Sequence, residues 1–157
     1  MKNRPWHTSY PAGVPTTINP DSYVSVVDLL EQSFKNYSKR EAFECMGTSI
    51  TYGELEEKSS AFASYLQNKL KLSKGDRIAI QMPNLLQYPI VMFGALGAGL
   101  VVVNTNPLYT EREMLHQFTD ADVQAVVIVS NFASKLQSIL SKTNIKHIIT
   151  TRIGDMH

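Results

Sequence analysis

The hydrophobic pattern of the chain is dominated by one stretch, from Ile78 to Thr110, that contains no charged side chain. So long an uncharged stretch must be buried, either inside a protein or inside a bilayer. It divides into a short apolar run, a turn pair, a longer run rich in Leu, Met and Ala, and a second β-rich run: Ile78–Met82, Pro83-Asn84, Leu85–Ala98 and Leu100–Val103. This pattern predicts a strand–helix–strand unit with parallel strands and a right-handed crossover.

A membrane span is the alternative to a protein core. The strictly apolar part, Ile90–Val103, is shorter than the ~20 residues needed to cross a bilayer, and Pro89 suits the first turn of a helix better than its middle. We therefore predict a core helix that Gly99 ends in the left-handed conformation. Gly94, Gly97 and Gly99 are expected to let this helix lie close against a sheet.

Capping residues and helical spacing predict further helices on both sides of this unit. In two capping boxes, a Thr and a Glu satisfy each other's exposed backbone N–H groups. The predicted helices begin at Ser25 (with Asp28 in its first turn, running to about Tyr37), at the Thr51/Glu54 box (running to about Lys71), at the Thr110/Glu113 box, and at Asn131 (running to Ser141).

Short β-rich runs alternate with these helices. Ala42–Met46 and Thr48–Thr51 flank Gly47 and suggest a hairpin. Val123–Val129 is predicted as a buried parallel strand, and Ile145–Thr150 as a last strand. This alternation predicts an α/β fold, with a mostly parallel sheet and helices on both faces.

The first twenty residues differ from the rest of the chain. They contain Pro5, Pro11, Pro15 and Pro20, which disfavour a regular helix and predict an extended, Pro-rich N-terminal arm over 1–20. The α/β domain is then assigned to 21–157. Trp6 and Tyr10 could pin the arm to this domain or dock on a partner subunit, and we expect the intramolecular contact.

Composition narrows the partners. Lys and Arg number 15 against 14 Asp and Glu, so no nucleic-acid partner is indicated. Cys45 is the chain's one cysteine, which excludes an internal disulfide, and it is expected to be an inert core thiol. The first residues lack the apolar segment of a signal peptide, so a cytoplasmic localisation is predicted.

Motifs that would identify a catalytic or metal site are absent from the sequence. It contains no G-x-x-x-x-G-K-[ST], G-x-G-x-x-G or G-x-S-x-G pattern. Glu113, His116 and Asp120 could share a helix face, but a solvated polar face explains them better than a metal site because one short helix offers no second pair of ligands.

Ligands of open α/β sheets lie beyond the carboxyl ends of the strands. The polar residues predicted there are Asn84, Asn104, Thr105, Asn106 and Tyr109. Asn and Thr are also common turn and cap residues, and that interpretation is favoured. The residue pattern alone therefore predicts an α/β domain without assigning its function.

Several motifs resemble the N-terminal part of bacterial long-chain fatty acid–CoA ligases, in the adenylate-forming superfamily. They are Gly75–Ala79, Met82–Pro89, Val103–Thr110, Thr51-Tyr52 followed by Glu54-Leu55, and, in the arm, Tyr10-Pro11 and Val14-Pro15. The resemblance covers about Trp6 to Asp155. It implies that the fold is the incomplete first part of the large N-terminal domain of such an enzyme.

The resemblance also implies a two-step reaction that uses ATP, Mg²⁺ and CoA. A long-chain fatty acid forms an acyl-adenylate with release of pyrophosphate, and CoA then displaces AMP. The family's Ser/Thr/Gly-rich phosphate loop, Tyr-x-x-Thr-Glu motif, ribose-binding Asp and catalytic Lys lie further along its chain, and none occurs here. No catalytic, cofactor-binding or metal residue is therefore assigned. We expect an N-terminal fragment that is inactive alone and binds none of these cofactors productively.

Two other hypotheses remain open. A ligase-derived interaction module could form a homodimer through the N-terminal region, as an N-terminal region can do in family members. The second hypothesis is peripheral contact with the inner membrane, because long-chain substrates partition into lipid. No basic amphipathic helix is evident, however.

Overall fold

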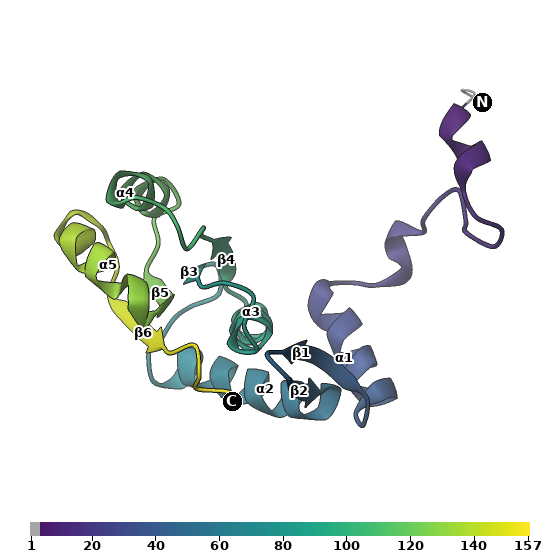
Figure 1. The fold of residues 1–157 in the computed structure, drawn as a ribbon, viewed down its shortest axis with the longest axis horizontal. Coiled ribbons are helices and arrows are strands. Elements are labelled where there is room, and N and C mark those ends of the chain that lie inside the picture. The colour runs from purple at the N-terminus through teal and green to yellow at the C-terminus, as the bar shows by residue number, and fades with distance from the viewer. Residues whose placement is uncertain (1–3) are drawn as a thin grey trace.

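The computed structural model describes residues 4–157 (Figure 1). Two short 3₁₀ turns, Pro5–Ser9 and Pro20–Ser22, precede the body of the protein. The body contains α1 (Val26–Tyr37), β1 (Glu41–Cys45), β2 (Thr48–Thr51), α2 (Tyr52–Asn68), β3 (Arg77–Gln81), α3 (Gln87–Gly97), β4 (Val101–Asn104), α4 (Glu111–Asp120), β5 (Ala125–Val129), α5 (Ala133–Ile139) and β6 (His147–Thr151).

Four of the strands form one parallel sheet in the order β4-β3-β5-β6. Ile78 in the central strand β3 pairs with Val102 of β4 on one side and Ala125 of β5 on the other. The prediction of parallel strands around the uncharged stretch is confirmed. Strand β5 is buried along its whole length, as expected of a strand enclosed on both faces.

Helices cover both faces of this sheet, as predicted (Figure 1). Ile78 and Ile80 of β3 point into a core shared with α2 and α3. Ala79, between them in sequence, points into the opposite core, which contains Met114 and Phe118 of α4 together with residues of α5. The alternation along β3 follows from the two-residue period of side chains in a strand.

The predicted hairpin forms a separate two-stranded antiparallel sheet, β1–β2. It shares a third core with α1, α2 and α3, built around Phe34, Ile50 and Leu55. After β6 the chain returns to this core, where Met156 packs against it, and a ring nitrogen of His157 lies 3.1 Å from Thr48 Oγ1.

The glycines of α3 do not contact the sheet, so that part of the prediction was wrong. A Cβ atom on Gly94 would lie 2.7 Å from the Ser59 carbonyl oxygen, and the nearest atom to one on Gly97 would be in Ala63. Both of these neighbours belong to α2. The glycines therefore allow two helices to pack closely, while Gly99 ends α3 with φ +80°, as predicted.

The N-terminal arm also differs from the prediction. Each of its two 3₁₀ turns begins with a proline, because the fixed φ of proline suits a first helical turn. Trp6 and Tyr10 contact His7 rather than the body, and they are 56% and 40% exposed. The arm projects away from the sheet (Figure 1), so the expected pinning contact is not formed.

Both capping boxes and the Ser25 cap are present as predicted. The predicted helix over Asn131–Ser141 is instead a short α-helix, α5, with a 3₁₀ turn at each end. Across residues 4–157, no helix combines the length and apolar character needed to span a bilayer.

Candidate functional site at the carboxyl edge of the sheet

The candidate site is the rim loop, defined as residues 104–109, which follows β4 at the carboxyl edge of the parallel sheet. The local sequence explains its shape. Asn106 Oδ1 accepts a hydrogen bond from the Leu108 N–H at 2.9 Å, which closes a side-chain-stabilised turn. This turn leaves the Leu108 side chain 76% exposed.

Side chains from four elements hold the rim loop in place, and at its end Lys135 Nζ of α5 donates to the Tyr109 carbonyl oxygen at 3.3 Å. Tyr88 Oη of α3 donates to Asn104 Oδ1 at 2.9 Å. Gln117 Nε2 of α4 donates to the Asn104 carbonyl oxygen at 3.1 Å, and Gln81 Nε2 of β3 donates to that of Asn106 at 3.3 Å. A loop held this firmly at the edge where α/β sheets bind ligands is the strongest site candidate in the described chain.

Buried acceptors next to the rim loop remain unpaired. Gln81 is fully buried, and neither its Oε1 nor that of Gln117 has a hydrogen-bond partner within residues 4–157. If either carboxamide were flipped, its oxygen would face the backbone carbonyl oxygen that its nitrogen now bonds. The hydrogen bonds therefore fix which side-chain atom is the oxygen. Gln87 likewise bonds through its nitrogen only: its Nε2 donates to the Arg152 carbonyl oxygen at 2.9 Å, and its buried Oε1 has no partner within residues 4–157.

The unpaired groups contribute one part of the hydrogen-bonding character of the rim. They are hydrogen-bond acceptors and therefore suit a group that carries N–H or O–H donors. Donors lie beside them as well, among them the Lys135 ammonium group at the Tyr109 carbonyl oxygen. No step of the chemistry can be assigned to these residues.

The predicted rim residues are only partly brought together. Asn104 and Asn106 share the loop, and Thr105 is buried with its hydroxyl 3.4 Å from the Val103 carbonyl oxygen. Tyr109 packs into the core beside α4. Asn84 lies toward the hairpin, where its carbonyl oxygen accepts from Cys45 Sγ at 3.4 Å. In their hydrogen bonds these residues act mainly as turn and packing residues.

The polar residues of α4 that were considered as metal ligands include Glu113, and its local contacts show what its carboxylate does. Glu113 accepts hydrogen bonds from the backbone N–H and hydroxyl of Thr110, and these bonds hold the pKa of its carboxyl below the usual value. Its carboxylate therefore serves the capping box. No group of three or more His, Cys, Asp or Glu suited to a metal ion occurs within residues 4–157.

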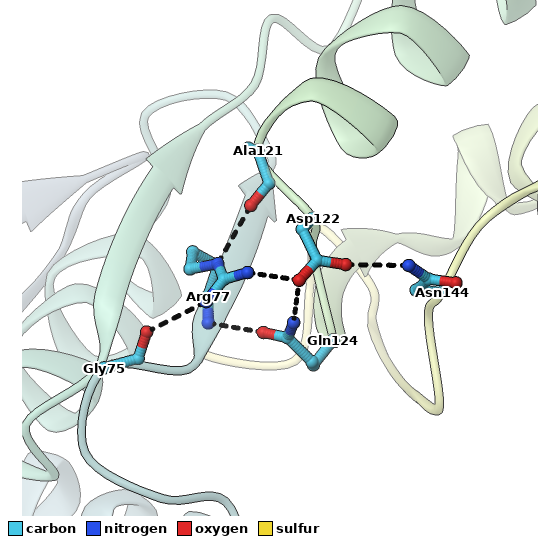
Figure 2. A network of polar contacts seen from close by, with 6 residues as sticks. All are labelled: Gly75, Arg77, Ala121, Asp122, Gln124 and Asn144. Carbon is cyan, nitrogen blue, oxygen red and sulfur yellow. Dashed lines mark hydrogen bonds and ion pairs between the residues drawn. The ribbon is translucent and has the colours of Figure 1, made fainter.

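A second polar network ties together the amino ends of three strands (Figure 2). The Arg77 guanidinium at the start of β3 forms an ion pair with Asp122 and donates from Nε to the Ala121 carbonyl oxygen at 3.0 Å. The Arg77 backbone N–H donates to Gln124 Oε1 at 2.7 Å, and Asn144 Nδ2 donates to Asp122 Oδ1, also at 2.7 Å.

Asp122 is the hub of this network. Its hydrogen bond from Asn144 and the charge of Arg77 lower the pKa of its carboxyl. Its own φ of +47° places it in the left-handed region, which Asp tolerates better than most residues. The network lies at the edge opposite the rim loop, so we assign it a structural role. Sequence reasoning missed it, and the only local signal was polar Asp122 and Gln124 directly before an apolar strand.

The fold is an open parallel α/β sheet, a class that carries ligands at its carboxyl edge. The family model described as "AMP-binding enzyme" matches residues 30–156. The chain therefore belongs to this family of adenylate-forming enzymes.

Similar proteins include a long-chain-fatty-acid–CoA ligase from Escherichia coli O157:H7, which is 56% identical over 150 residues. A long-chain-fatty-acid–CoA ligase from Bacillus subtilis (strain 168) is 30% identical over 155 residues. These matches cover 96% and 99% of this chain but only 27% of each relative. The chain thus spans about a quarter of the length of the curated relatives that it matches.

Solved structures agree with this fold. A long-chain-fatty-acid–CoA ligase from Archaeoglobus fulgidus matches with a TM-score of 0.78 at 19% identity, over 94% of this chain and 32% of that one. A benzoate CoA ligase from Burkholderia xenovorans LB400 matches with a TM-score of 0.74 at 27% identity, over 80% of this chain and 25% of that one.

Proposed function

We propose that this chain is the N-terminal part of a long-chain fatty acid–CoA ligase. The observation that carries the proposal is 56% identity, over 96% of the chain, to a protein of that name. The complete enzyme would convert a long-chain fatty acid, ATP and CoA into acyl-CoA, AMP and pyrophosphate through an acyl-adenylate, with Mg²⁺ supporting the phosphate chemistry.

Within such an enzyme, the role that we propose for this chain is to act as a scaffold. The rim loop, held by Tyr88, Gln81 and Gln117, would face the remaining lobes. The chain carries none of the family's phosphate, adenylate or catalytic motifs. We therefore propose that it is catalytically inactive alone and binds ATP, Mg²⁺ and CoA productively only as part of the larger protein.

A chimera tests the ligase assignment. This chain would replace the matching segment of the Escherichia coli ligase, and palmitoyl-CoA formation would be measured. We expect a folded chimera that forms palmitoyl-CoA, because the two segments are 56% identical over 150 residues. A folded chimera that forms no palmitoyl-CoA would contradict the assignment.

The chain alone tests the scaffold role. With palmitate, Mg²⁺ and ATP, it should catalyse no exchange of labelled pyrophosphate into ATP. Turnover above a buffer blank, retained through two chromatographic steps, would refute the proposal that it lacks catalytic machinery.

The exposed arm favours one second candidate, a non-catalytic module that forms dimers or binds an intact ligase. Trp6, Tyr10 and Val24 are exposed apolar side chains on a segment that buries none of its residues in either 3₁₀ turn. Light scattering of the chain, with and without residues 1–25, would show a dimer that depends on the arm. A monomer at high micromolar concentration with no affinity for intact ligase would exclude this role.

The setting that we propose for the complete ligase is the cytoplasm, with peripheral contact at the inner membrane surface, where long-chain substrates partition. Vesicles containing anionic lipid provide the test. Sedimentation of the chain with such vesicles would support the membrane contact. Recovery of all the protein in the supernatant would contradict the proposal that this chain makes the contact.

A further inference from the structure

The segment that follows β6, residues 152–157, is named the strap because it runs from the parallel sheet back to the β1–β2 hairpin (Figure 1). Its first residues are fixed beside the sheet. Gln87 Nε2 of α3 donates to the Arg152 carbonyl oxygen at 2.9 Å. Asp155 Oδ2 accepts from the Arg152 N–H at 2.8 Å and from the Thr151 hydroxyl at 3.1 Å. These bonds turn the chain directly after the strand.

The last residues of the strap are fixed on the hairpin. Met156 packs against the core that contains Ile50 of β2. A ring nitrogen of His157 lies 3.1 Å from the Thr48 hydroxyl oxygen, although the two residues are 109 positions apart in sequence. The strap therefore joins the end of β6 to the second strand of the hairpin.

The base of the hairpin has anchors of its own. The Tyr52 N–H donates to the Arg40 carbonyl oxygen at 2.9 Å. The Gly53 N–H donates to that of Ser38, also at 2.9 Å. Both bonds join the backbone before β1 to the backbone after β2 and do not involve the strap. The base would therefore stay in place if the strap were released.

The tip of the hairpin is held more weakly. Its turn residue Met46 is 72% exposed. Beside it, Cys45 Sγ donates to the Asn84 carbonyl oxygen at 3.4 Å, and a thiol is a weak donor. Phe43 packs against Phe93, with ring centroids 6.4 Å apart. Segments with few buried contacts open locally before the rest of a protein unfolds, so the contacts that the strap adds matter most at the tip.

We propose that the strap is a latch that controls whether the hairpin lies against α3. With the strap seated, the hairpin is closed and Cys45 is partly covered. Release of the strap lets the hairpin turn about its base, which exposes Cys45 and the apolar surface behind it. The latch lies within this chain, so it goes beyond the proposed ligase function and does not depend on it.

Cys45 reports on the latch because it is the chain's one cysteine. Its reaction with a bulky thiol reagent would be followed together with hydrogen exchange of the backbone amides of β1 and β2. Met156→Ala removes a side chain from the shared core and should raise both rates about ten-fold, which corresponds to about 1.4 kcal/mol. Thr48→Val removes the hydroxyl that meets His157 and leaves the core intact, so it should raise both rates about two- to three-fold.

Ile153→Ala is the matched control, because Ile153 lies in the same strap but is 40% exposed. It should leave both rates unchanged. Hydrogen exchange in β5 should stay unchanged in all three variants, because release of the latch leaves the parallel sheet folded. Circular dichroism would confirm that each variant is folded, and if Met156→Ala is not, Thr48→Val decides the test.

Three results would each overturn the proposal. They are unchanged Cys45 and hairpin rates in the folded latch variants, an equal rise in Ile153→Ala, and an equal rise of exchange in β5, which would mean that the whole fold had been loosened. Ligase activity enters none of these measurements, so their outcome is separate from that of the chimera.

Discussion

Gly94→Ala is expected to destabilise the protein even though it replaces a helical glycine with the best helix former. In the interior of a helix the change should contribute about 1 kcal/mol of stability. Here, however, the added Cβ would lie 2.7 Å from the Ser59 carbonyl oxygen and 3.0–3.2 Å from two atoms of Phe62. The nearest atom belongs to the backbone of α2, so it cannot move aside as a flexible side chain would.

Overpacking of a close-packed core typically costs about 1–3 kcal/mol, and this contact belongs in the upper part of that range. The net loss for Gly94→Ala should then be about 1–2 kcal/mol. At this chain length that corresponds to a fall of roughly 2–8 °C in Tm. Urea unfolding followed by far-ultraviolet circular dichroism would measure the free energy directly, with a thermal scan beside it.

Gly97→Ala is the matched control in the same helix. Its added Cβ would meet only Ala63 Cβ, at 4.0 Å, which is an ordinary contact. This variant should be neutral or more stable by up to about 1 kcal/mol. A Gly94→Ala protein as stable as the wild type, or a larger loss in Gly97→Ala, would refute the account of close helix packing.

Three further predictions follow from caps, charges and exposure. Thr51→Ala removes an N-cap and should lower the free energy of unfolding by about 1 kcal/mol in urea titrations. The hydrogen bonds from Thr51 hold the pKa of Glu54 below its usual 4.5, so the stability that they contribute is present above that pH and is lost as the pH falls below it. Thr51→Ala removes the hydroxyl bond but keeps the backbone N–H bond, so this acid limb should become shallower without disappearing, and an unchanged limb would count against the role of the hydroxyl. Asp122→Asn should lower the urea midpoint at pH 7. Because the pKa of Asp122 is also lowered, the difference in midpoint from the wild type should narrow as acid protonates the wild-type carboxyl. A difference that widens in acid would contradict the role of the charge. Brief chymotrypsin treatment should cut within residues 4–25 and leave a resistant product that begins near α1, as mass spectrometry would show, whereas early cleavage in the sheet would be inconsistent with the fold.

Elements with a local signal were predicted well from the sequence. Thr51 with Glu54, and Thr110 with Glu113, form capping boxes because both partners lie within one helical turn. The φ of Gly99 and the hairpin around Gly47 likewise depend on neighbouring residues. The likeness of the motifs to the ligase family depended on contiguous residues in the same way, and the family match confirmed it.

The candidate site could be predicted only in part. The rule for parallel sheets placed residues 104–109 at the correct edge. The two glutamines that hold the rim loop, Gln81 and Gln117, carried no such signal, because they bond to residues 25 and 13 positions away in sequence. A buried carboxamide is recognised as unusual only when its partners can be counted in three dimensions.

By itself, the amino-acid sequence determined which segments are helices and strands, which stretch is buried, and where helices begin, because propensity, periodicity and capping act over a few residues. Only the tertiary structure decided the strand order β4-β3-β5-β6, the packing of Gly94 against α2 rather than the sheet, the bond network from Arg77 to Asn144, and the projection of the arm from the body. These features depend on contacts between distant segments, and the free energy of such contacts depends on shape and partner rather than on local sequence.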